Sequence, residues 1–515
     1  MRVAVIGAGV AGLVTAKTLL QAGHEVVVLD KTPDVGGVWS ATRRYPGLTT
    51  QSAKATYGFS DYPMPREYPE WPTGEQVQQW LAGYAAHFGV ERCLRLNTEV
   101  VAAQRDAAGA WTLQLRGADG ATATETFDRL VVANGIFSEP NVPDYPGREA
   151  FEAAGGRLCA GTDLHDAEEA RGKHVVVVGY GKSACDVTVP VSEVAAGTHI
   201  IARQLLWKVP RRIGGFLNFK FLLLTRMGEA LFPYLHKRGM ERFLHGPGNP
   251  MRRSMINSIG SVSVRQFKLR ELDLVPRGTM EGIVKGAIGL ATEGFFEGVA
   301  AGRITVHRDT TVTALTARDG RPAAELADGS VVPADLVICA TGFTQGVPFL
   351  NADVQAGLFD ERGNFMLYRQ ILPLNVEGVY FNGYNSSFFS PLNAEMAALW
   401  IAADLAGAVD LPAPDERRRA VVEQLAFMDE ATARHHSRGG KIIPFSMHNV
   451  DEVLGDLDVN IPARVRASHW LNPVNPGAYR RVSKTLIGRL GAPAPAPAAS
   501  AAPQPASAEE PVRAA

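Results

Sequence analysis

Two glycine-rich turns, each lying between a short apolar strand and a helix, constrain the fold of this chain most strongly. Their defining positions are Gly7, Gly9 and Gly12 in the first turn and Gly179, Gly181 and Ala184 in the second. In such a turn the first glycine allows the tight bend, the second lets the backbone approach a pyrophosphate, and the third lets the helix pack closely on the strand. Unpaired N–H groups at the start of the helix then face the phosphates. The sequence therefore predicts two Rossmann-like dinucleotide-binding units.

The residue that ends the next strand differs between the two units. Asp30 follows the strand predicted over residues 25–29, and a carboxylate there can accept hydrogen bonds from ribose hydroxyls. Arg203 stands at the matching place after the strand 198–202. A guanidinium cannot accept from a ribose hydroxyl, but it can pair with a 2′-phosphate. We therefore expect FAD at the first turn and NADPH, rather than NADH, at the second. The alternative is that Arg203 is a solvated surface residue.

The segments around the two turns repeat one layout. Residues 98–132 and 303–340 both read as strands, and each ends in an apolar strand that leads to a glycine, as LVVANG and LVICATG. Alternating strands and helices indicate parallel sheets with covered faces. We predict an α/β fold with two nested Rossmann-like domains, the FAD domain being interrupted by the NADPH domain, together with a helical cap. The expected parts are the FAD domain at 1–155 and 336–490, the NADPH domain at 156–335 with a helical insertion at about 205–300, and a disordered Ala/Pro-rich tail at 491–515.

The amino-acid composition of the chain disfavours some classes of partner and of binding site. Lys plus Arg number 52 and Asp plus Glu number 53, so the net charge of −1 does not favour nucleic acid as a partner. The four cysteines are scattered, which predicts neither a disulfide framework nor a metal site and fits a cytoplasmic protein. Charged residues interrupt the Phe- and Leu-rich stretch 213–235, so we expect a buried or amphipathic lid. Peripheral membrane contact is a disfavoured alternative, and the oligomeric state is left open.

Two neighbouring dinucleotide sites suggest hydride transfer from a nicotinamide to a flavin. The reduced flavin then needs an electron acceptor. No cysteine pair follows the first turn, which argues against a disulfide reductase. Dioxygen is the remaining common acceptor, and it would lead to oxygenation of a substrate. An uncoupled NADPH oxidase or reductase and a non-catalytic cofactor-binding module are the alternatives.

Longer motifs resemble the class B flavoprotein monooxygenases over roughly residues 1–410. The nearest subgroup is the flavin-containing monooxygenases, and the Baeyer–Villiger monooxygenases are related. The motifs are GGVW at 36–39, YPGLTTQSAKATYGFSDYPMP at 45–65, ATGF at 340–343 and NAEMAALW at 393–400. The fingerprint F-x-G-x-x-x-H plus an aromatic residue is only partly kept, because Gly161 and His165 are present whereas Cys159 and Glu169 replace the aromatic residues.

The resemblance implies an NADPH- and O2-dependent FAD monooxygenase that oxygenates a small apolar substrate through a flavin C4a-hydroperoxide. N- or S-oxygenation is favoured over Baeyer–Villiger oxidation of a ketone. Gln51 stands where flavin-containing monooxygenases usually carry Asn and Baeyer–Villiger enzymes usually carry Asp, so it is the candidate catalytic residue. Its amide keeps a donor and an acceptor but reaches one methylene further. The replacement also leaves the oxidase alternative open.

The residues expected to contact the cofactors come from both turns and from the resemblance. For FAD they are Gly7, Gly9, Val10, Ala11, Gly12, Asp30, Lys31, Gly37, Val38, Trp39, Gln51, Val100, Thr341, Gly342 and Asn393; for NADPH they are His165, Gly179, Gly181, Lys182, Ser183, Ala184 and Arg203. No metal ligands are expected.

Overall fold

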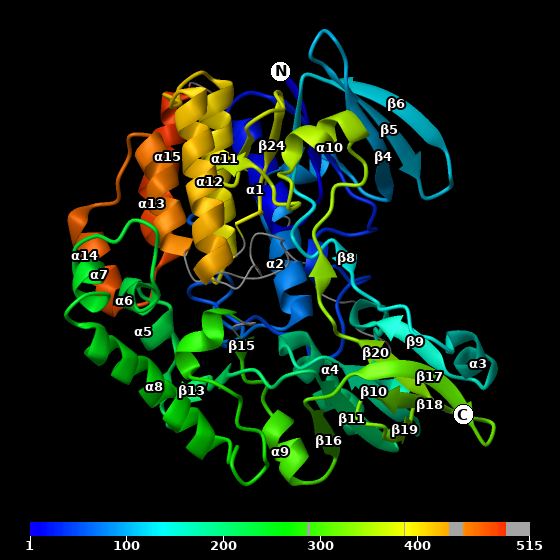
Figure 1. Cartoon of the computed structure of the whole chain (residues 1–515). Coiled ribbons are helices and arrows are strands. Elements are labelled where there is room, and N and C mark those ends of the chain that lie inside the picture. Colours follow the sequence, from blue (N-terminus) through cyan, green and yellow to red (C-terminus); the bar gives the residue numbers. More distant parts are fainter. Residues whose placement is uncertain (286–288, 386, 432–445, 491–515) are drawn as a thin grey trace, which may run out of the picture.

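The computed structural model describes residues 1–285, 289–385, 387–431 and 446–490 (Figure 1). The predicted tail, 491–515, lies outside these residues. Two parallel sheets form the frame, and Figure 1 shows the second sheet below the first, with the helical insertion beside it. No helix of the described residues is long and apolar enough to cross a membrane.

The first sheet surrounds the first glycine turn. Its strand order is β24-β7-β1-β2-β3, and every neighbouring pair is parallel. Its strands are β1 (Arg2–Ile6), β2 (Glu25–Leu29), β3 (Leu94–Arg95), β7 (Arg129–Val132) and β24 (Val379–Phe381). Helices α1 (Val10–Gln21) and α11 (Ser390–Leu405) pack against each other, and α2 (Gly74–His87) covers α1 from the other side. The predicted strand–turn–helix–strand of residues 2–29 is confirmed.

The second sheet surrounds the second glycine turn in the same way. Its order is β16-β11-β10-β20-β9, again all parallel. Its strands are β9 (Arg157–Ala160), β10 (His174–Val178), β11 (Gly197–Ala202), β16 (Ile304–Arg308) and β20 (Leu336–Cys339), and helix α4 (Lys182–Ser192) follows the turn. The chain enters this sheet after β7 and rejoins the first sheet through β24. The domain boundaries themselves stay predictions.

Each sheet carries a three-stranded antiparallel companion, as the repeated layout predicts. The first comprises β4 (Thr98–Arg105), β5 (Trp111–Gly117) and β6 (Thr122–Phe127), and the second β17 (Val312–Arg318), β18 (Arg321–Leu326) and β19 (Val331–Pro333). Trp111 is fully buried, so this ribbon packs on the sheet rather than extending into solvent. Other elements are α3 (Arg148–Ala153), α10 (Ala352–Leu358), α12 (Pro414–Ala431), β8 (Glu139–Pro140), β13 (Arg212–Ile213), β14 (Leu217–Asn218), β21 (Phe343–Thr344), β22 (Leu367–Tyr368) and β23 (Leu372–Pro373).

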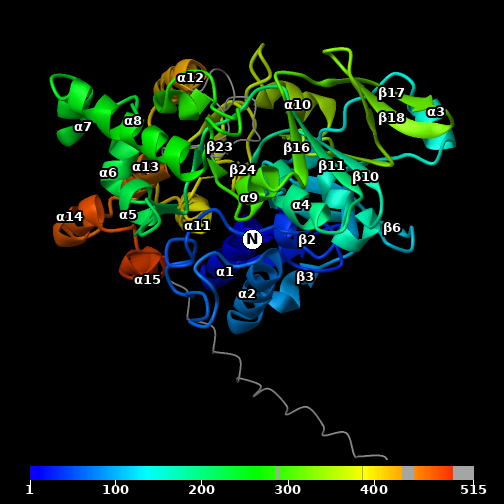
Figure 2. The same cartoon turned by 90° about the horizontal axis from the view of Figure 1, so that it is seen from below.

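The segment predicted as a helical insertion is largely helical. It holds β12 (Lys208–Val209), α5 (Lys220–Leu223), α6 (Arg226–Ala230), α7 (Met240–Leu244), α8 (Asn249–Gln266), β15 (Gly289–Leu290) and α9 (Phe295–Ala300). Figures 1 and 2 show α5 to α8 beside the C-terminal helices α13 (Ser446–Asp456), α14 (Ala463–Leu471) and α15 (Arg480–Arg489). The buried Glu229 carboxylate accepts hydrogen bonds from the backbone N–H groups of Met447 and His448, which ties the insertion to the start of α13.

Candidate dinucleotide and oxygenation site

The two glycine turns have the same backbone geometry. Gly7 has φ +110° and Gly179 has φ +125°, a region that L side chains rarely adopt. A Cβ at Gly7 would lie 2.5 Å from the carbonyl oxygen of Ala133, and one at Gly179 would lie 2.5 Å from that of Ala340. Both carbonyls follow the neighbouring parallel strand. The close approach therefore requires glycine at each first position, as the pattern predicts.

The remaining glycines around the two turns either allow close packing of the backbone or leave room for a ligand. A Cβ at Gly12 would lie 1.8 Å from the carbonyl oxygen of Gly7, so this glycine lets α1 pack on the turn. Gly9 and Gly37 face each other, and a Cβ on either would lie within 3.4 Å of the other's Cα. At Gly181 a Cβ would meet no atom within 4 Å. Side chains at Gly9 or Gly181 would thus occupy the space that a dinucleotide backbone needs.

Asp30 and Arg203, which follow the second strand of each unit, lie beside their turns but differ in the contacts that their side chains make. The Asp30 carboxylate accepts from the backbone N–H of Ala8 at 2.6 Å and from that of Thr32 at 2.9 Å, and it lines the large cavity described below. Arg203 follows β11, whose Ile201 carbonyl accepts from the Gly179 N–H at 2.9 Å, so Arg203 lies at the same sheet edge as the turn. The Arg203 side chain is exposed and makes no ion pair with the described residues. That Arg203 selects NADPH over NADH stays a prediction.

One cavity of about 550 Å³ runs from the first glycine turn to the start of α4. It therefore brings both predicted dinucleotide sites together. The predicted residues that line it are Gly7, Gly9, Val10, Ala11, Asp30, Lys31, Gly37, Val38, Trp39, Gln51, Val100, Lys182 and Ser183. The predicted residues Gly12, Gly179, Gly181, Ala184 and Arg203 do not line it. The space fits an extended two-part ligand, because the glycines of the first turn lie at one end and the start of α4 at the other, with polar groups between them.

Gln51 lies at the end of the loop of residues 45–51, where this loop contacts the insertion. Its Oε1 accepts from the backbone N–H of Leu290 in β15 at 3.4 Å. A Cβ on Gly289 would lie 3.8 Å from both Gln51 Oε1 and Lys182 Cβ, so Gln51 and the start of α4 flank one point. Because its oxygen takes the Leu290 N–H, the Gln51 amide NH2 remains as a donor beside the cavity.

Sequence reasoning missed a buried polar network at the start of α4. Asp186 is 1% exposed, and its Oδ1 accepts from Lys182 Nζ and, at 2.6 Å, from Thr292 Oγ1. Its Oδ2 has no hydrogen-bond partner among the described residues. Burial lowers the pKa of the Lys182 ammonium, while the Asp186 carboxylate opposes this shift. The i, i+4 spacing of Lys182 and Asp186 on a helix could have indicated the pair, but Thr292 is 106 residues away.

A second set of contacts joins the loop of residues 45–51 to α4. The Tyr45 hydroxyl donates to Ser183 Oγ at 2.8 Å, and a Cβ on Gly47 would lie 2.3 Å from the Asp186 carbonyl oxygen. The loop that carries Gln51 therefore packs on the helix of the second turn. In this way the fold places the candidate catalytic side chain between the two dinucleotide sites.

Four residues predicted from the resemblance, His165, Thr341, Gly342 and Asn393, lie around the cavity without lining it, whereas Gln51 lines it. His165 is exposed, with Nδ1 3.5 Å from the Arg44 carbonyl oxygen. The backbone of Gly342 accepts from Asn141 at 2.9 Å, and the Thr341 hydroxyl donates to the Asn141 carbonyl. Asn393 is buried near the start of α11, and its amide donates to Ser387 Oγ at 3.0 Å and to the Phe389 carbonyl. Ser390 and Ala394 of α11 do line the cavity. Cofactor contacts of these four predicted residues stay predictions.

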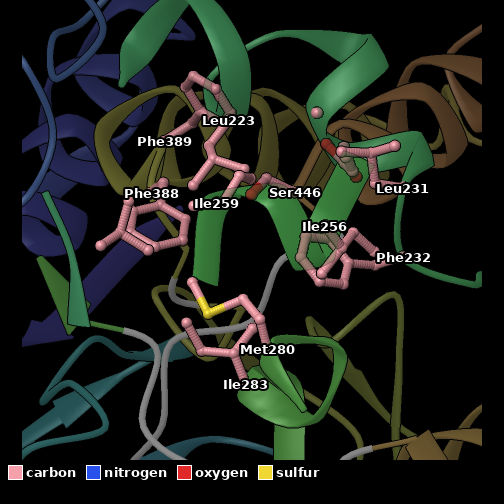
Figure 3. A pocket seen from close by; sticks show the side chains of 13 residues that line it. Leu223, Leu231, Phe232, Ile256, Ile259, Met280, Ile283, Phe388, Phe389 and Ser446 are labelled. Atoms are coloured by element: carbon pink, nitrogen blue, oxygen red, sulfur yellow. The ribbon is translucent and has the colours of Figure 1, made fainter. Parts of the chain in front are cut away.

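A smaller apolar cavity of about 40 Å³ adjoins the large one at Phe388, which lines both (Figure 3). Figure 3 shows the apolar side chains that surround it: Leu223 from α5, Ile256 and Ile259 from α8, Met280 and Ile283 from the 3-10 helix Met280–Lys285, and Phe388 and Phe389 from the segment before α11. Glu229 also borders it, and burial raises the pKa of this carboxyl to about 7. Its oxygens are held by the start of α13, so the wall that faces the cavity is mostly hydrocarbon.

Comparison with known proteins agrees with this geometry. Residues 1–245 match the family described as flavin-binding monooxygenase-like. A protein of Marinomonas mediterranea, 4-hydroxybenzoate brominase (decarboxylating), is 26% identical over 82% of this chain and 77% of its own length. Flavin-containing monooxygenase 5 of Oryctolagus cuniculus is 25% identical over 88% of this chain and 83% of its own.

Solved structures share the fold at lower identity. Cyclohexanone monooxygenase from Rhodococcus sp. Phi1, bound to NADP+, superposes with a TM-score of 0.65 at 18% identity, covering 88% of this chain and 96% of that one. S-allyl-L-cysteine S-oxygenase from Allium sativum has a TM-score of 0.60 at 20% identity, covering 95% and 97%. Sequence family, fold and the paired glycine turns agree. The comparisons therefore support a class B flavin monooxygenase, an oxidoreductase that uses FAD and NADPH and incorporates one oxygen atom, and the matching family covers residues 1–245, just under half of the chain.

Proposed function

We propose that this chain oxygenates a small apolar substrate with NADPH and O2, and that the reaction is N- or S-oxygenation rather than Baeyer–Villiger oxidation. The observation that carries the proposal is the single cavity that extends from the first glycine turn past Gln51 to Lys182 and Ser183, the residues that follow the second turn. One ligand can then lie at each turn with the reacting ends meeting between them. The relatives named as flavin-containing monooxygenases and as an S-oxygenase support the choice of reaction.

The chain's residues bind and orient, and the cofactors supply the redox chemistry. FAD held at Gly7–Gly12 would, once reduced by NADPH, supply the activation of O2. The N-termini of α1 and α4 would each face a pyrophosphate. Gln51 would donate its amide N–H to the ligand in the cavity, because Leu290 N–H already holds its oxygen. The insertion would exclude bulk water from this point, since β15 covers Gln51.

The apolar cavity at Phe388 supports an apolar substrate. Its volume of about 40 Å³ exceeds the roughly 10–15 Å³ that one water needs. Its walls offer few polar partners, so hydrocarbon would fill it more favourably than water. We propose that a small apolar part of the substrate lies there while the atom to be oxygenated stays near Gln51.

An oxygen-coupling assay tests the proposed function. NADPH consumption, O2 uptake and H2O2 release would be measured with a panel of alkyl and aryl sulfides, tertiary amines and cyclic ketones. We expect sulfoxide or N-oxide to form in nearly equal amounts to the NADPH consumed. Ester or lactone as the main product would favour the Baeyer–Villiger alternative. Stoichiometric H2O2 with every compound would instead establish an NADPH oxidase and contradict the proposal.

Removing the Phe388 ring should admit bulkier substrates. Phe388→Ala would join the two cavities, and roughly 50 Å² of added apolar contact at about 25 cal/mol/Å² is worth about 1.2 kcal/mol. The KM for a tert-butyl-substituted aryl sulfide should then fall about eightfold relative to that for dimethyl sulfide. Phe221→Ala is the matched control, because Phe221 lies in the same insertion but is 48% exposed. An equal change in both variants would show that Phe388 does not separate the cavities.

A further inference from the structure

Arg211 is a largely buried guanidinium at the edge of the site. Its side chain is 16% exposed and lies over the Trp71 ring, with Cζ 5.0 Å from the ring centroid. One terminal nitrogen donates to Thr49 Oγ1 at 2.8 Å. Its Nε is buried and has no hydrogen-bond partner among the described residues. Much of the donor capacity of this side chain is therefore unused.

No buried carboxylate is dedicated to Arg211 in the described part of the chain. Glu293 approaches to 3.5 Å but is 87% exposed, so water screens this pair. Asp186 is near enough to act on the charge of Arg211, but Lys182 and Thr292 already bind it. Burial lowers the pKa of Arg211, which reflects the cost of keeping its charge away from water. The two largely buried cations, Lys182 and Arg211, thus share one buried carboxylate, and only the exposed Glu293 offsets the remaining positive charge.

The loop bonded to Arg211 reaches the reaction cavity. Thr49 lines that cavity, two residues before Gln51. Its oxygen accepts from Arg211, so its hydroxyl proton is available to another acceptor. Arg211 lies behind Thr49 and does not itself line the cavity, so its positive charge next to the Thr49 hydroxyl donor matches a carboxylate placed in the cavity at Thr49. A buried cation that lacks its own counterion is costly unless an anion joins it.

We propose that Arg211 and Thr49 bind an anionic group of the substrate, such as a carboxylate. This inference rests on the proposed monooxygenase function and makes its substrate class narrower: an apolar molecule that carries one acidic group. The acidic group binds at Thr49 and the apolar remainder extends toward Gln51 and Phe388. A phosphate of the nicotinamide cofactor has the same chemistry, so the test must separate the two sources.

Two sulfides of nearly equal shape provide the test. 4-(Methylthio)benzoate carries a carboxylate, and 4-(methylthio)benzamide replaces it with a neutral amide. In the unaltered protein we expect the KM for the benzoate to be about tenfold lower than that for the benzamide. Arg211→Met should reduce this ratio to about one. Arg211→Lys should keep part of it, because the charge remains while the planar fork is lost.

Arg212→Met is the matched control, since Arg212 is the exposed neighbour and should leave the KM ratio unchanged. Thermal melting of each variant would separate loss of folding from loss of recognition. An unaltered protein that does not distinguish the two sulfides would overturn the inference. So would an Arg211→Met variant that keeps the ratio but binds NADPH more weakly, because this would assign Arg211 to the cofactor. If neither sulfide is oxygenated and neutral thioanisole is not either, the proposed function itself fails.

Discussion

A Gly9→Asp variant is expected to purify with less than about a tenth of the flavin of the unaltered protein, whereas Gly181→Asp should keep its flavin and lose affinity for NADPH. Both glycines cap a helix in extended backbone that other residues can adopt, so the fold should survive. The new carboxylate would lie in the space of a pyrophosphate. At 4 Å and an effective dielectric of 20, two like charges repel by about 4 kcal/mol, which exceeds a hundredfold in binding.

The two variants act as controls for each other. Flavin content would be measured from absorbance after desalting, and NADP+ affinity by titration of protein fluorescence. Gly455→Asp, in the last turn of α13, adds the same charge where a Cβ meets no atom within 4 Å. If both turn variants lost flavin equally, the assignment of separate cofactors to the two turns would be wrong.

The strands and helices around the two glycine turns could be predicted, because residues that are close in the sequence determine them. The strand at 25–29 has the predicted bounds, and the helix predicted after the first turn spans 10–21, since a glycine turn, an apolar helix face and the glycine that follows the helix act within a few residues. The repeated strands likewise follow from short-range alternation. Both cofactor turns are therefore visible in the sequence, and the cavity between them follows from placing the two sheets side by side.

The long-range polar contacts of the site could not be predicted in this way. Asp186 meets Thr292 across 106 residues, and Arg211 meets Thr49 across 162. These contacts exist because the insertion folds back over α4 and over the loop at residues 45–51. No periodicity or motif signals a contact made by tertiary packing. The same reasoning explains Asn393, whose side chain turns to Ser387 although its helix begins beside the cavity.

Arg203→Ala should raise the KM for NADPH about tenfold at low ionic strength and leave the KM for NADH nearly unchanged. NADPH carries a 2′-phosphate that a guanidinium can bind through two parallel hydrogen bonds, and NADH has only a hydroxyl there. Arg203 is exposed and makes no ion pair with the described residues, so its removal breaks no ion pair among them. Initial rates of oxidation of each cofactor, with a saturating sulfide, would measure the two KM values.

Salt provides the internal check on this assignment. Because Arg203 is exposed, its attraction to a phosphate is screened, and the Debye length falls from about 10 Å at 0.1 M to about 3 Å at 1 M salt. The difference between the unaltered protein and Arg203→Ala should therefore shrink as salt rises. Arg318→Ala removes an equally exposed arginine from β17 and should change neither KM. Equal increases for NADPH and NADH in Arg203→Ala would mean that the residue supports the turn itself, and the selection of the phosphorylated cofactor would then have to come from another cation.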